Sequence, residues 1–526
     1  MENPTTAGPQ TPVATATAAA TTAGPQKSVA TATNGATNAA TTPGQETTGA
    51  QLAALIDRAV VAGEAWASTP PAVRAAALSA IADRLDAAAG ELVPLAQSET
   101  HLLEGRLGGE LKRTTFQLRL FAEMLEEGSF ADARIDHADP EWPMGARPDI
   151  RRVLEPLGPV VVFAASNFPF AFSVAGGDTC SALAAGCPVI LKVHPGHPQL
   201  SARVGALVAE ALEAAGAPDG LLSLIYGTEA GRAALLDPRV KAASFTGSIP
   251  GGRALFDLAV SRPEPIPFYG ELGSVNPTFV TRSAAARRGG QIAAEFLASY
   301  TLGAGQFCTK PGVLLVPAGS DILELLRSAE QPGPAPLLNE RIQHGYVEVL
   351  QGLLEHDAVE ALVLGEDSFA EPPAPTLIAT NVQAVLADPE GLITECFGPT
   401  ALVVTYTDES ELLELARVLN GQLTATIQGE EDDAVAPELV RLLAQKAGRV
   451  LWNQWPTGVS VTYAQQHGGP YPATTTPGTT SVGTASISRF LRPVAYQGLP
   501  EALLPAALQE SNPLAIPRRL DGTLAG

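Results

Sequence analysis

Val160–Ala164 (VVVFA) is a short apolar run that begins a repeated alternation of strand-like and helix-like segments. The next strand-like runs are Val189–Leu191, Leu222–Ile225 and Ala242–Phe245, and segments with helical patterns stand between them. Short β-rich runs that alternate with helices predict a parallel sheet with helices on both of its faces. We therefore expect an α/β fold here, of the kind that binds ligands at the carboxyl ends of its strands.

The regions on either side of this stretch show related patterns. Residues 52 to 127 are rich in Ala, Leu and charged residues, with apolar residues three and four positions apart, which predicts helices. Residues 128 to 151 predict an irregular or extended excursion. Residues 271 to about 469 contain further strand-like runs and predict a second α/β region.

The first 48 residues differ in composition from the rest of the chain. They are mostly Thr, Ala, Pro, Gly and Asn, and the sequence TAGPQ occurs at Thr6–Gln10 and again at Thr22–Gln26. A segment with almost no large apolar side chains cannot offset the entropy cost of its own ordering. We predict that residues 1–48 form a disordered, low-complexity tail.

Composition restricts the class of protein. The chain has 526 residues, of which 45% are hydrophobic and 17% charged, and its net charge is −22. These values predict a soluble, acidic, globular protein that binds neither nucleic acid nor an anionic membrane. The four cysteines show no C-x-x-C spacing and no secretory signal precedes them, so we expect free thiols in a reducing cytoplasm.

The stretch Gly305–Lys310 (GQFCTK) contains a candidate nucleophile, Cys308. A thiolate is a strong nucleophile, but a lone cysteine is more often a small buried hydrophobe. Glu271 stands between Gly270 and an apolar residue, and poor solvation there would raise its pKa into the range useful for a base. A solvated surface carboxylate is the equal alternative for Glu271.

Several residues near the ends of predicted strands suit an oxyanion or a nucleotide. The side-chain amide of Asn167 could donate to an oxyanion, or it could simply stabilise a turn. Lys192 ends a strand, where ligands often bind, although a solvated charge is the commoner case. Gly247 and Ser248 precede a predicted helix, where backbone N–H groups can approach a pyrophosphate, but turn glycines are common there too.

The histidines give no sign of a metal site. His194, His197 and His467 show no metal-binding spacing, so we expect polar or structural roles for them and no bound metal.

Taken together, these motifs resemble the aldehyde dehydrogenase superfamily over roughly residues 50 to 500. The motifs that carry the resemblance follow the family's order: Asn167-Phe168-Pro169, Lys192, Phe245-Thr246-Gly247-Ser248, Glu271-Leu272-Gly273, Gly305–Thr309 and Glu395-Cys396-Phe397-Gly398-Pro399.

The resemblance implies the aldehyde dehydrogenase fold. A Rossmann-like cofactor domain is expected in residues 49–127 and 152–270, and an α/β catalytic domain in residues 271–475. A small oligomerisation element with the chain's tail is expected in residues 128–151 and 476–526. Strand exchange between subunits in this family implies a homodimer or homotetramer.

The resemblance also implies a catalytic cycle. Cys308 attacks the aldehyde carbon, and the Asn167 amide with the backbone N–H of Cys308 holds the oxyanion. Hydride transfer to a nicotinamide leaves a thioester, and Glu271 activates the water that hydrolyses it.

The resemblance further implies how the cofactor is bound. Lys192 and Glu395 bind ribose hydroxyls, Ser248 and its neighbour Gly247 bind the pyrophosphate, and Phe397 packs near the nicotinamide ribose.

Four longer segments look like one branch of the family, the 2-oxoglutarate semialdehyde (2,5-dioxopentanoate) dehydrogenases of sugar-acid catabolism. They are Tyr269–Pro277, Asn453–Val459, His467–Thr474 and Arg489–Val494. A carboxylate-bearing aldehyde implies a cation near the pocket, but the sequence does not select among the arginines. Broad aliphatic, fatty and succinate semialdehyde oxidation stay open.

Pro195 indicates the cofactor preference. Many NAD-specific members of the family have a Glu three residues after the strand-end Lys, and this chain has Pro195 there. No carboxylate at this position repels a 2′-phosphate, and His194, His197 or Arg232 could attract one. We expect NADP to be preferred, with NAD accepted as an alternative.

Two functions from other classes are the rivals. One is a cofactor-independent hydrolase that uses Cys308 and Glu271, and the other is a catalytically silent binding protein on the same fold. The nucleotide-binding motifs disfavour the first and the retained catalytic residue types disfavour the second.

Overall fold

The computed structural model describes residues 44–365 and 367–525, all within one compact unit. Residues 1–43 of the predicted low-complexity tail lie outside the described residues. The last part of that predicted tail belongs to the folded unit instead. Thr47 is buried and exchanges two hydrogen bonds with the backbone of Tyr226, and the Thr48 side chain caps the first helix. These polar contacts order a segment that has little apolar surface.

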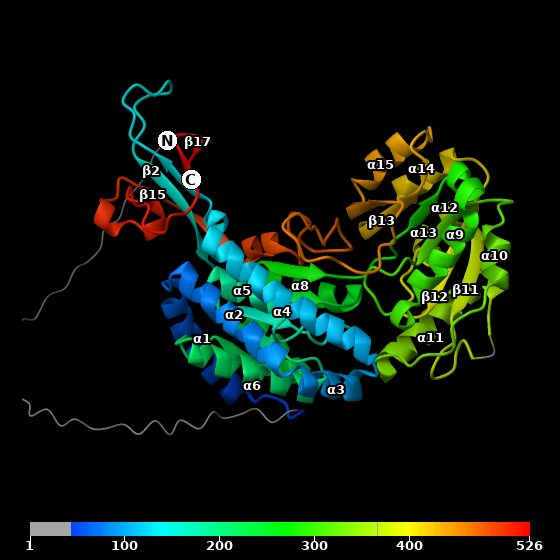
Figure 1. Cartoon of the computed structure of the whole chain (residues 1–526), viewed down its shortest axis with the longest axis horizontal. Coiled ribbons are helices and arrows are strands. Elements are labelled where there is room, and N and C mark those ends of the chain that lie inside the picture. Colours follow the sequence, from blue (N-terminus) through cyan, green and yellow to red (C-terminus); the bar gives the residue numbers. More distant parts are fainter. Residues whose placement is uncertain (1–43, 366, 526) are drawn as a thin grey trace, which may run out of the picture. The chain divides into compact units, whose positions relative to one another are not determined.

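The first sheet has five parallel strands in the order β5-β4-β3-β6-β7 (Figure 1). The strands are β3 (Val160–Phe163), β4 (Val189–Lys192), β5 (Leu222–Ile225), β6 (Ala242–Thr246) and β7 (Phe268–Glu271). The four strand-like runs of the sequence are confirmed as β3 to β6. The register pairs Phe163 with Lys192 and Thr246 with Glu271, so the carboxyl ends of these strands share one edge. Glu271 thus ends the first sheet, and does not begin the next unit as expected.

Helices cover both faces of the first sheet. Val160 and Val162 point into one apolar cluster, whereas Val161 and Phe163 point into another. The predicted helical region contains four helices, and others connect the strands. They are α1 (Gly49–Ala67), α2 (Pro71–Ala87), α3 (Ala89–Thr100), α4 (Glu104–Glu127), α5 (Gly177–Ala185), α6 (Pro198–Ala214), α7 (Thr228–Leu236) and α8 (Ile249–Ser261).

The second sheet has seven strands in the order β10-β11-β12-β9-β8-β13-β14, parallel except for β10. Its central strand β9 alternates in the same way, with Val313 and Leu315 in one cluster and Leu314 and Val316 in the other. The strands are β8 (Thr278–Val280), β9 (Val313–Pro317), β10 (Glu360–Val363), β11 (Thr376–Asn381), β12 (Thr400–Tyr406), β13 (Gln422–Gln428) and β14 (Ala447–Trp452). The accompanying helices are α9 (Arg282–Thr301), η2 (Leu302–Gly305), α10 (Ile322–Ser328), α11 (Glu340–Leu354), α12 (Val382–Ala387), α13 (Pro389–Leu392), α14 (Ser410–Val418) and α15 (Ala436–Leu443).

The third sheet joins two segments that are far apart in the sequence (Figure 1). Its strand order is β15-β2-β1-β16-β17. The elements are η1 (Ser129–Ala131), β1 (Ala133–Asp136), β2 (Ile150–Pro156), β15 (Leu491–Gln497), η4 (Glu501–Leu503), η5 (Ala506–Leu508), β16 (Arg518–Leu520) and β17 (Thr523–Ala525).

Residues 476 to 490 contact the first sheet and its helices, although the expectation placed them in the oligomerisation element and tail. Their helix η3 (Thr484–Phe490) packs against α5. Arg489 forms a buried ion pair with Asp178 at 2.6 Å and donates to the carbonyl of Tyr269 on β7 at 3.2 Å. This packing holds the preceding loop against the end of β7.

Among the residues that the structure describes, no helix has both the length and the apolar character needed to cross a membrane.

Candidate active site

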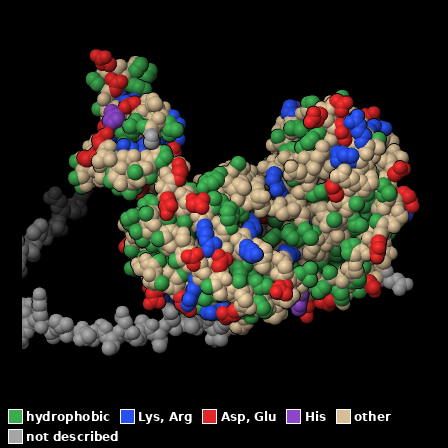
Figure 2. Space-filling view, in the orientation of Figure 1, with side chains coloured by type: hydrophobic (Ala, Val, Ile, Leu, Met, Phe, Trp, Pro, Cys, Tyr) green, Lys and Arg blue, Asp and Glu red, His purple; other side chains and the backbone are tan. Residues whose placement is uncertain are grey.

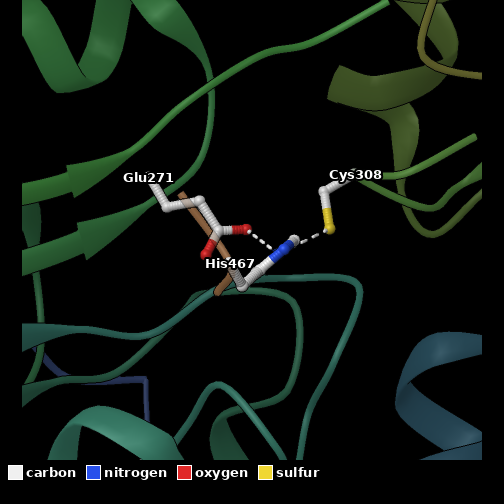
Figure 3. Close-up of side chains that lie close together, drawn as sticks. All are labelled: Glu271, Cys308 and His467. Atoms are coloured by element: carbon white, nitrogen blue, oxygen red, sulfur yellow. Dashed lines mark hydrogen bonds and ion pairs between the residues drawn. The ribbon is translucent and has the colours of Figure 1, made fainter. Parts of the chain in front are cut away.

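Three side chains from distant parts of the chain lie together at the end of the first sheet (Figure 3). Glu271 ends β7, Cys308 follows η2, and His467 lies between β14 and η3. His467 Nε2 lies 2.8 Å from Glu271 Oε1 and 3.6 Å from Cys308 Sγ. Glu271 and His467 are buried, whereas Cys308 is half-buried. A thiol, an imidazole and a carboxylate in a row can support nucleophilic chemistry.

The same atoms could also hold a metal ion. One ligand atom from each of the three side chains lies within 4.8 Å of the other two. The spacing of histidines in the sequence gave no hint of this grouping, because it arises only when three distant segments meet.

Glu271 has a lowered pKa, which reverses the expectation from its apolar sequence neighbours. Burial alone would raise the pKa, but the adjacent His467 and hydrogen bonds from His467 and Ser481 lower it below its usual value. Ser481 Oγ–H donates to Oε2, so both carboxylate oxygens have donors. Glu271 is therefore an ionised carboxylate, ready to accept a proton.

Cys308 needs a base before it can act as a nucleophile. Burial raises the pKa of its thiol well above the usual value, and the negative charges of Glu271 and Glu395 raise it further, while Arg113 opposes them. The resting side chain is thus a protonated thiol. The ionised Glu271, which has a carboxylate oxygen within 4.8 Å of Sγ, is the neighbouring group placed to take the proton, and His467 Nε2 lies beside both.

Sequence reasoning assigned His467 a polar or structural role and missed its position beside Cys308. The signal was the segment His467–Thr474, which carries the branch resemblance, but a single histidine cannot be located without the fold. In the structure the position of His467 is held by a hydrogen bond from its backbone N–H to the Thr480 hydroxyl at 2.8 Å.

Asn276 holds the segment that carries Cys308 in place through hydrogen bonds. The Asn276 side-chain amide donates to the carbonyls of Cys308 at 2.8 Å and Lys310 at 2.9 Å. Gln422 Oε1 accepts from the backbone N–H of Asn276 at 3.1 Å, which fixes Asn276 in turn. These buried polar groups are all paired, so Cys308 lies on a rigid support.

Asn167 reaches the nucleophile segment from the loop after β3. Its buried amide donates to the carbonyl of Gln306 at 3.2 Å. Glu110 of α4 holds this loop, since its Oε1 accepts from the backbone N–H groups of Phe170 and Ala171 at 2.8 and 2.9 Å. The structure therefore brings Asn167 beside the Cys308 segment, as an oxyanion donor would require.

Lys310 links the segment that carries Cys308 to the segment that carries Glu395 through hydrogen bonds. Its buried ammonium donates to the carbonyls of Cys396, Gly398 (3.0 Å) and Thr400 (2.7 Å). Burial raises the pKa of Glu395 to about 7, although the charge of Lys310 and a backbone N–H donor act against this rise.

Phe397, the remaining predicted residue of this segment, is partly buried against the core of the first sheet. Its ring therefore bridges from the Glu395 segment to the sheet that ends at Glu271.

We expect Lys310→Met to weaken cofactor binding and stability together. The substitution removes a donor from three buried carbonyls, of which that of Gly398 also accepts the Thr400 N–H, and this costs about 3 kcal/mol of the free energy of unfolding. It also releases the Glu395 segment, so the KM for cofactor should rise more than kcat falls. Denaturant unfolding and cofactor titration measure the two effects, with Lys112→Met on an exposed face as control. An unchanged free energy of unfolding would contradict this role for Lys310.

The predicted cofactor residue Lys192 lies in a positively charged corner at the end of β4. Burial and the positive charge of Arg341 lower its pKa. Arg341, on α11, was not identified from the sequence, since it joins this corner only through the packing of α11. Burial and the charges of His197, Lys192 and Arg341 lower the pKa of His194 to about 3. His194 is therefore neutral and can approach a phosphate only as a hydrogen-bond donor.

The other two predicted phosphate contacts are less favourable. His197 is buried, and its ring nitrogens lie 2.9 Å from the Ala165 carbonyl and 3.0 Å from the Ser201 hydroxyl. These contacts give His197 a structural role. Arg232 lies 3.9 Å from Glu229 within α7. No contact joins Arg232 to Lys192 among the described residues.

Gly247 and Ser248 form the turn before α8, at the edge shared with Glu271. The Gly247 N–H donates to the carbonyl of Glu271 at 3.0 Å, and Ser248 Oγ accepts from the N–H of Gly251 at 3.3 Å. A Cβ at Gly247 would lie 2.6 Å from the ring of Phe245, so this close approach requires glycine. Ser248 is exposed, which leaves the first turn of α8 open to an anion.

Comparisons with known proteins agree with this geometry. Residues 22–330 match the model of the aldehyde dehydrogenase family. Alpha-ketoglutaric semialdehyde dehydrogenase 2 from Azospirillum brasilense is 47% identical over 467 residues, which cover 87% of this chain and 89% of that protein. Alpha-ketoglutaric semialdehyde dehydrogenase from Acinetobacter baylyi is 43% identical over 457 residues, which cover 86% of this chain and 87% of that protein.

Solved structures with low sequence identity share the fold. A 3,6-anhydro-L-galactose dehydrogenase in complex with NAP has a TM-score of 0.72 and 22% identity, covering 86% of this chain and 92% of that chain. A 1-pyrroline-5-carboxylate dehydrogenase from Thermus with bound NAD has a TM-score of 0.70 and 21% identity, covering 86% of both chains. The fold predicted from the sequence is confirmed.

Proposed function

The chain belongs to the aldehyde dehydrogenase family, and from this premise we propose that it oxidises 2-oxoglutarate semialdehyde to 2-oxoglutarate with a nicotinamide cofactor. The two curated relatives that are 47% and 43% identical to this chain, both alpha-ketoglutaric semialdehyde dehydrogenases, support the substrate. The observation that carries the chemistry is the contact of Cys308 Sγ with His467 Nε2 beside Glu271.

The first step is the loss of the thiol proton from Cys308. Because Glu271 is ionised, His467 donates its Nε2–H to Glu271 Oε1. Cys308 Sγ lies 3.6 Å from the same nitrogen. The thiol proton therefore goes to the Glu271 carboxylate, which has an oxygen within 4.8 Å of Sγ, while His467 keeps its own proton and hydrogen-bonds to that carboxylate. The thiolate then forms a C–S bond to the aldehyde carbon, and the carbonyl electron pair moves to oxygen.

The new oxyanion needs hydrogen-bond donors. The Asn167 amide, which reaches the carbonyl of Gln306, and the backbone N–H of Cys308 are the candidates. A fixed donor at a developing negative charge contributes about 3–4 kcal/mol to such a step.

The edge of the first sheet fits a dinucleotide. The open first turn of α8 with Ser248 suits a pyrophosphate, and Lys192 and Glu395 suit ribose hydroxyls. A nicotinamide held there would supply the hydride acceptor for the thiohemiacetal carbon, which would leave the acyl group on Cys308 as a thioester.

Glu271 then serves the hydrolytic step. It first releases the proton received from the thiol to solvent, and its lowered pKa favours the ionised form. The carboxylate takes a proton from water, the water oxygen bonds to the acyl carbon, and the C–S bond breaks. The sulfur leaves as a thiolate and the product as a carboxylic acid.

We also propose that NADP is the preferred cofactor. Pro195 places no carboxylate against a 2′-phosphate, and Lys192 with Arg341 supplies positive charge. His194 accepts the N–H of Gly196 on Nδ1 at 3.0 Å, so its Nε2 carries the proton and could donate to phosphate. NAD remains usable because the pyrophosphate and ribose contacts do not involve the 2′-position.

The domain roles and the assembly are part of the same proposal. The first sheet would serve as the cofactor domain, the second as the catalytic domain and the third as the oligomerisation element. Support comes from β15, an edge strand whose side chains are largely exposed after Leu491. We propose a homodimer or homotetramer in the cytoplasm.

The proposed function is tested by following reduced-nicotinamide absorbance with two aldehydes and two cofactors. We expect 2-oxoglutarate semialdehyde with NADP to be oxidised fastest, ahead of the same aldehyde with NAD and of hexanal with either cofactor. A preference for hexanal would overturn the substrate and keep the chemistry. A preference for NAD of about a hundredfold, or 2.7 kcal/mol, would overturn the cofactor assignment. Folded protein that binds no nucleotide would favour the hydrolase.

A further inference from the structure

Three arginines lie near enough to Cys308 to interact with its charge. They are Arg106 and Arg113 on α4 and Arg449 on β14. Burial lowers the pKa of all three, and a negative charge on Cys308 acts in the opposite direction on each of them. Figure 2 shows Lys and Arg side chains over α4, beside the hollow of this face of the molecule. One of these arginines is therefore the natural partner of an anionic group on the substrate.

The guanidinium of Arg106 is already bound to other groups of the protein. Its Nη2 donates to the carbonyl of Asn167 at 2.7 Å, and its guanidinium lies 4.4 Å from the ring centre of Phe307 and 5.3 Å from that of Phe168. The other two nitrogens are closed off from solvent. Arg106 thus supports the loop that carries Asn167, and its guanidinium has no pair of accessible nitrogens with which to bind a ligand.

The guanidinium of Arg449 is bound to other groups of the protein as well. Its Nη2 donates to the carbonyl of Pro456 at 2.8 Å, its Nη1 donates to that of Gly458 at 3.2 Å, and its Nε is buried. These bonds fix the loop after β14 and use the face of the guanidinium that would otherwise bind a carboxylate.

Arg113 differs from both. Its Nε makes one long hydrogen bond of 3.4 Å to the carbonyl of Val459, and its guanidinium lies 5.5 Å from the ring centre of Phe172. Within residues 44–365 and 367–525, neither Nη1 nor Nη2 has a partner, and neither is among the closed-off buried atoms. Arg113 is half-buried, and its positive charge lowers the pKa of Cys308.

From this geometry we propose that Arg113 binds the carboxylate of the aldehyde substrate through its two free Nη nitrogens, and so selects aldehydes that carry a carboxylate. This inference rests on the proposed function, which supplies a substrate with that group. A guanidinium fork matches the two oxygens of a carboxylate, and partial burial strengthens the pair because solvent screens it less. The Phe172 ring limits the motion of the guanidinium.

The test compares charged and neutral aldehydes in two variants. Arg113→Met should lower kcat/KM for 2-oxoglutarate semialdehyde and succinate semialdehyde about a hundredfold, mainly through KM. The constants for hexanal should stay within about twofold, since hexanal has no carboxylate for this residue to bind. Arg113→Lys keeps the charge but loses the fork, so it should lose about tenfold with the semialdehydes. Lys112→Met, one residue away on the exposed side of α4, is the matched control for net charge.

Each other result overturns the inference in a recognisable way. Equal losses with hexanal and the semialdehydes would make Arg113 a structural residue, and unchanged constants for all three aldehydes would remove it from the site, while the proposed function stands in both cases. A native protein that oxidises hexanal but neither semialdehyde would overturn the proposed function and the inference with it. If Arg113→Met does not fold, Arg113→Lys decides, because an unchanged KM for the semialdehydes excludes a forked contact.

Discussion

Cys308→Ala is expected to abolish aldehyde oxidation, lowering kcat by at least about 10⁴-fold, because no other group can form the thioester. NADP binding should survive nearly unchanged, since the residues proposed to hold the cofactor lie on β4, at the start of α8 and on the Glu395 segment. Initial rates measure the first effect, and titration with NADP followed by quenching of tryptophan fluorescence measures the second. Loss of activity with retained binding would assign Cys308 to the chemical step.

Cys187→Ala is the matched control for this experiment. Cys187 is buried, its thiol donates to the carbonyl of Phe490 at 3.4 Å, and burial raises its pKa to about 11. Its removal should leave turnover unchanged. Oxidation at the native rate by Cys308→Ala would refute the assignment, and parallel losses in both variants would point to damaged folding.

Glu271→Gln is expected to lower steady-state turnover by about 10³-fold, because the amide cannot take a proton from water. From the sequence alone, a burst of reduced cofactor could survive this substitution. The structure changes that expectation, since Glu271 accepts from the same His467 nitrogen that contacts Cys308. We therefore expect the burst to slow as well. Rapid mixing of enzyme, NADP and aldehyde measures both phases.

The outcomes for Glu271→Gln separate its two roles. A burst at the native rate would confine Glu271 to thioester hydrolysis and leave the thiol proton to His467 and solvent. Unchanged steady-state turnover would remove Glu271 from the mechanism altogether. Glu264→Gln, at an exposed carboxylate, controls for the lost charge.

Much of the fold could be predicted because its signals are local. The strands β3 and β4 are buried on both faces, so they read as continuous apolar runs, and α1 to α4 show the helical spacing of apolar residues. The boundaries were less accurate. Thr47 belongs to the fold through two polar contacts with Tyr226, which composition does not reveal.

Charge states were the least predictable part of the site. Glu271 was expected to have a raised pKa because its sequence neighbours are apolar, but its spatial neighbours His467 and Ser481 lower it. His194 was expected to attract a phosphate by charge, but burial keeps it neutral. In both cases the pKa depends on groups that are distant in the sequence.

The sequence by itself determined the parallel sheet, the candidate nucleophile Cys308 and the family motifs, because each is a pattern within a few neighbouring residues. Only the tertiary structure decided which groups surround that nucleophile. His467 reaches Cys308 across 159 residues and Glu271 across 196, and it does so because the loop before η3 is packed against the end of β7. Arg113 is likewise distinguished from Arg106 and Arg449 by which nitrogens the fold leaves unpaired. Proximity and hydrogen-bond saturation are properties of packing, and packing joins residues that no local pattern connects.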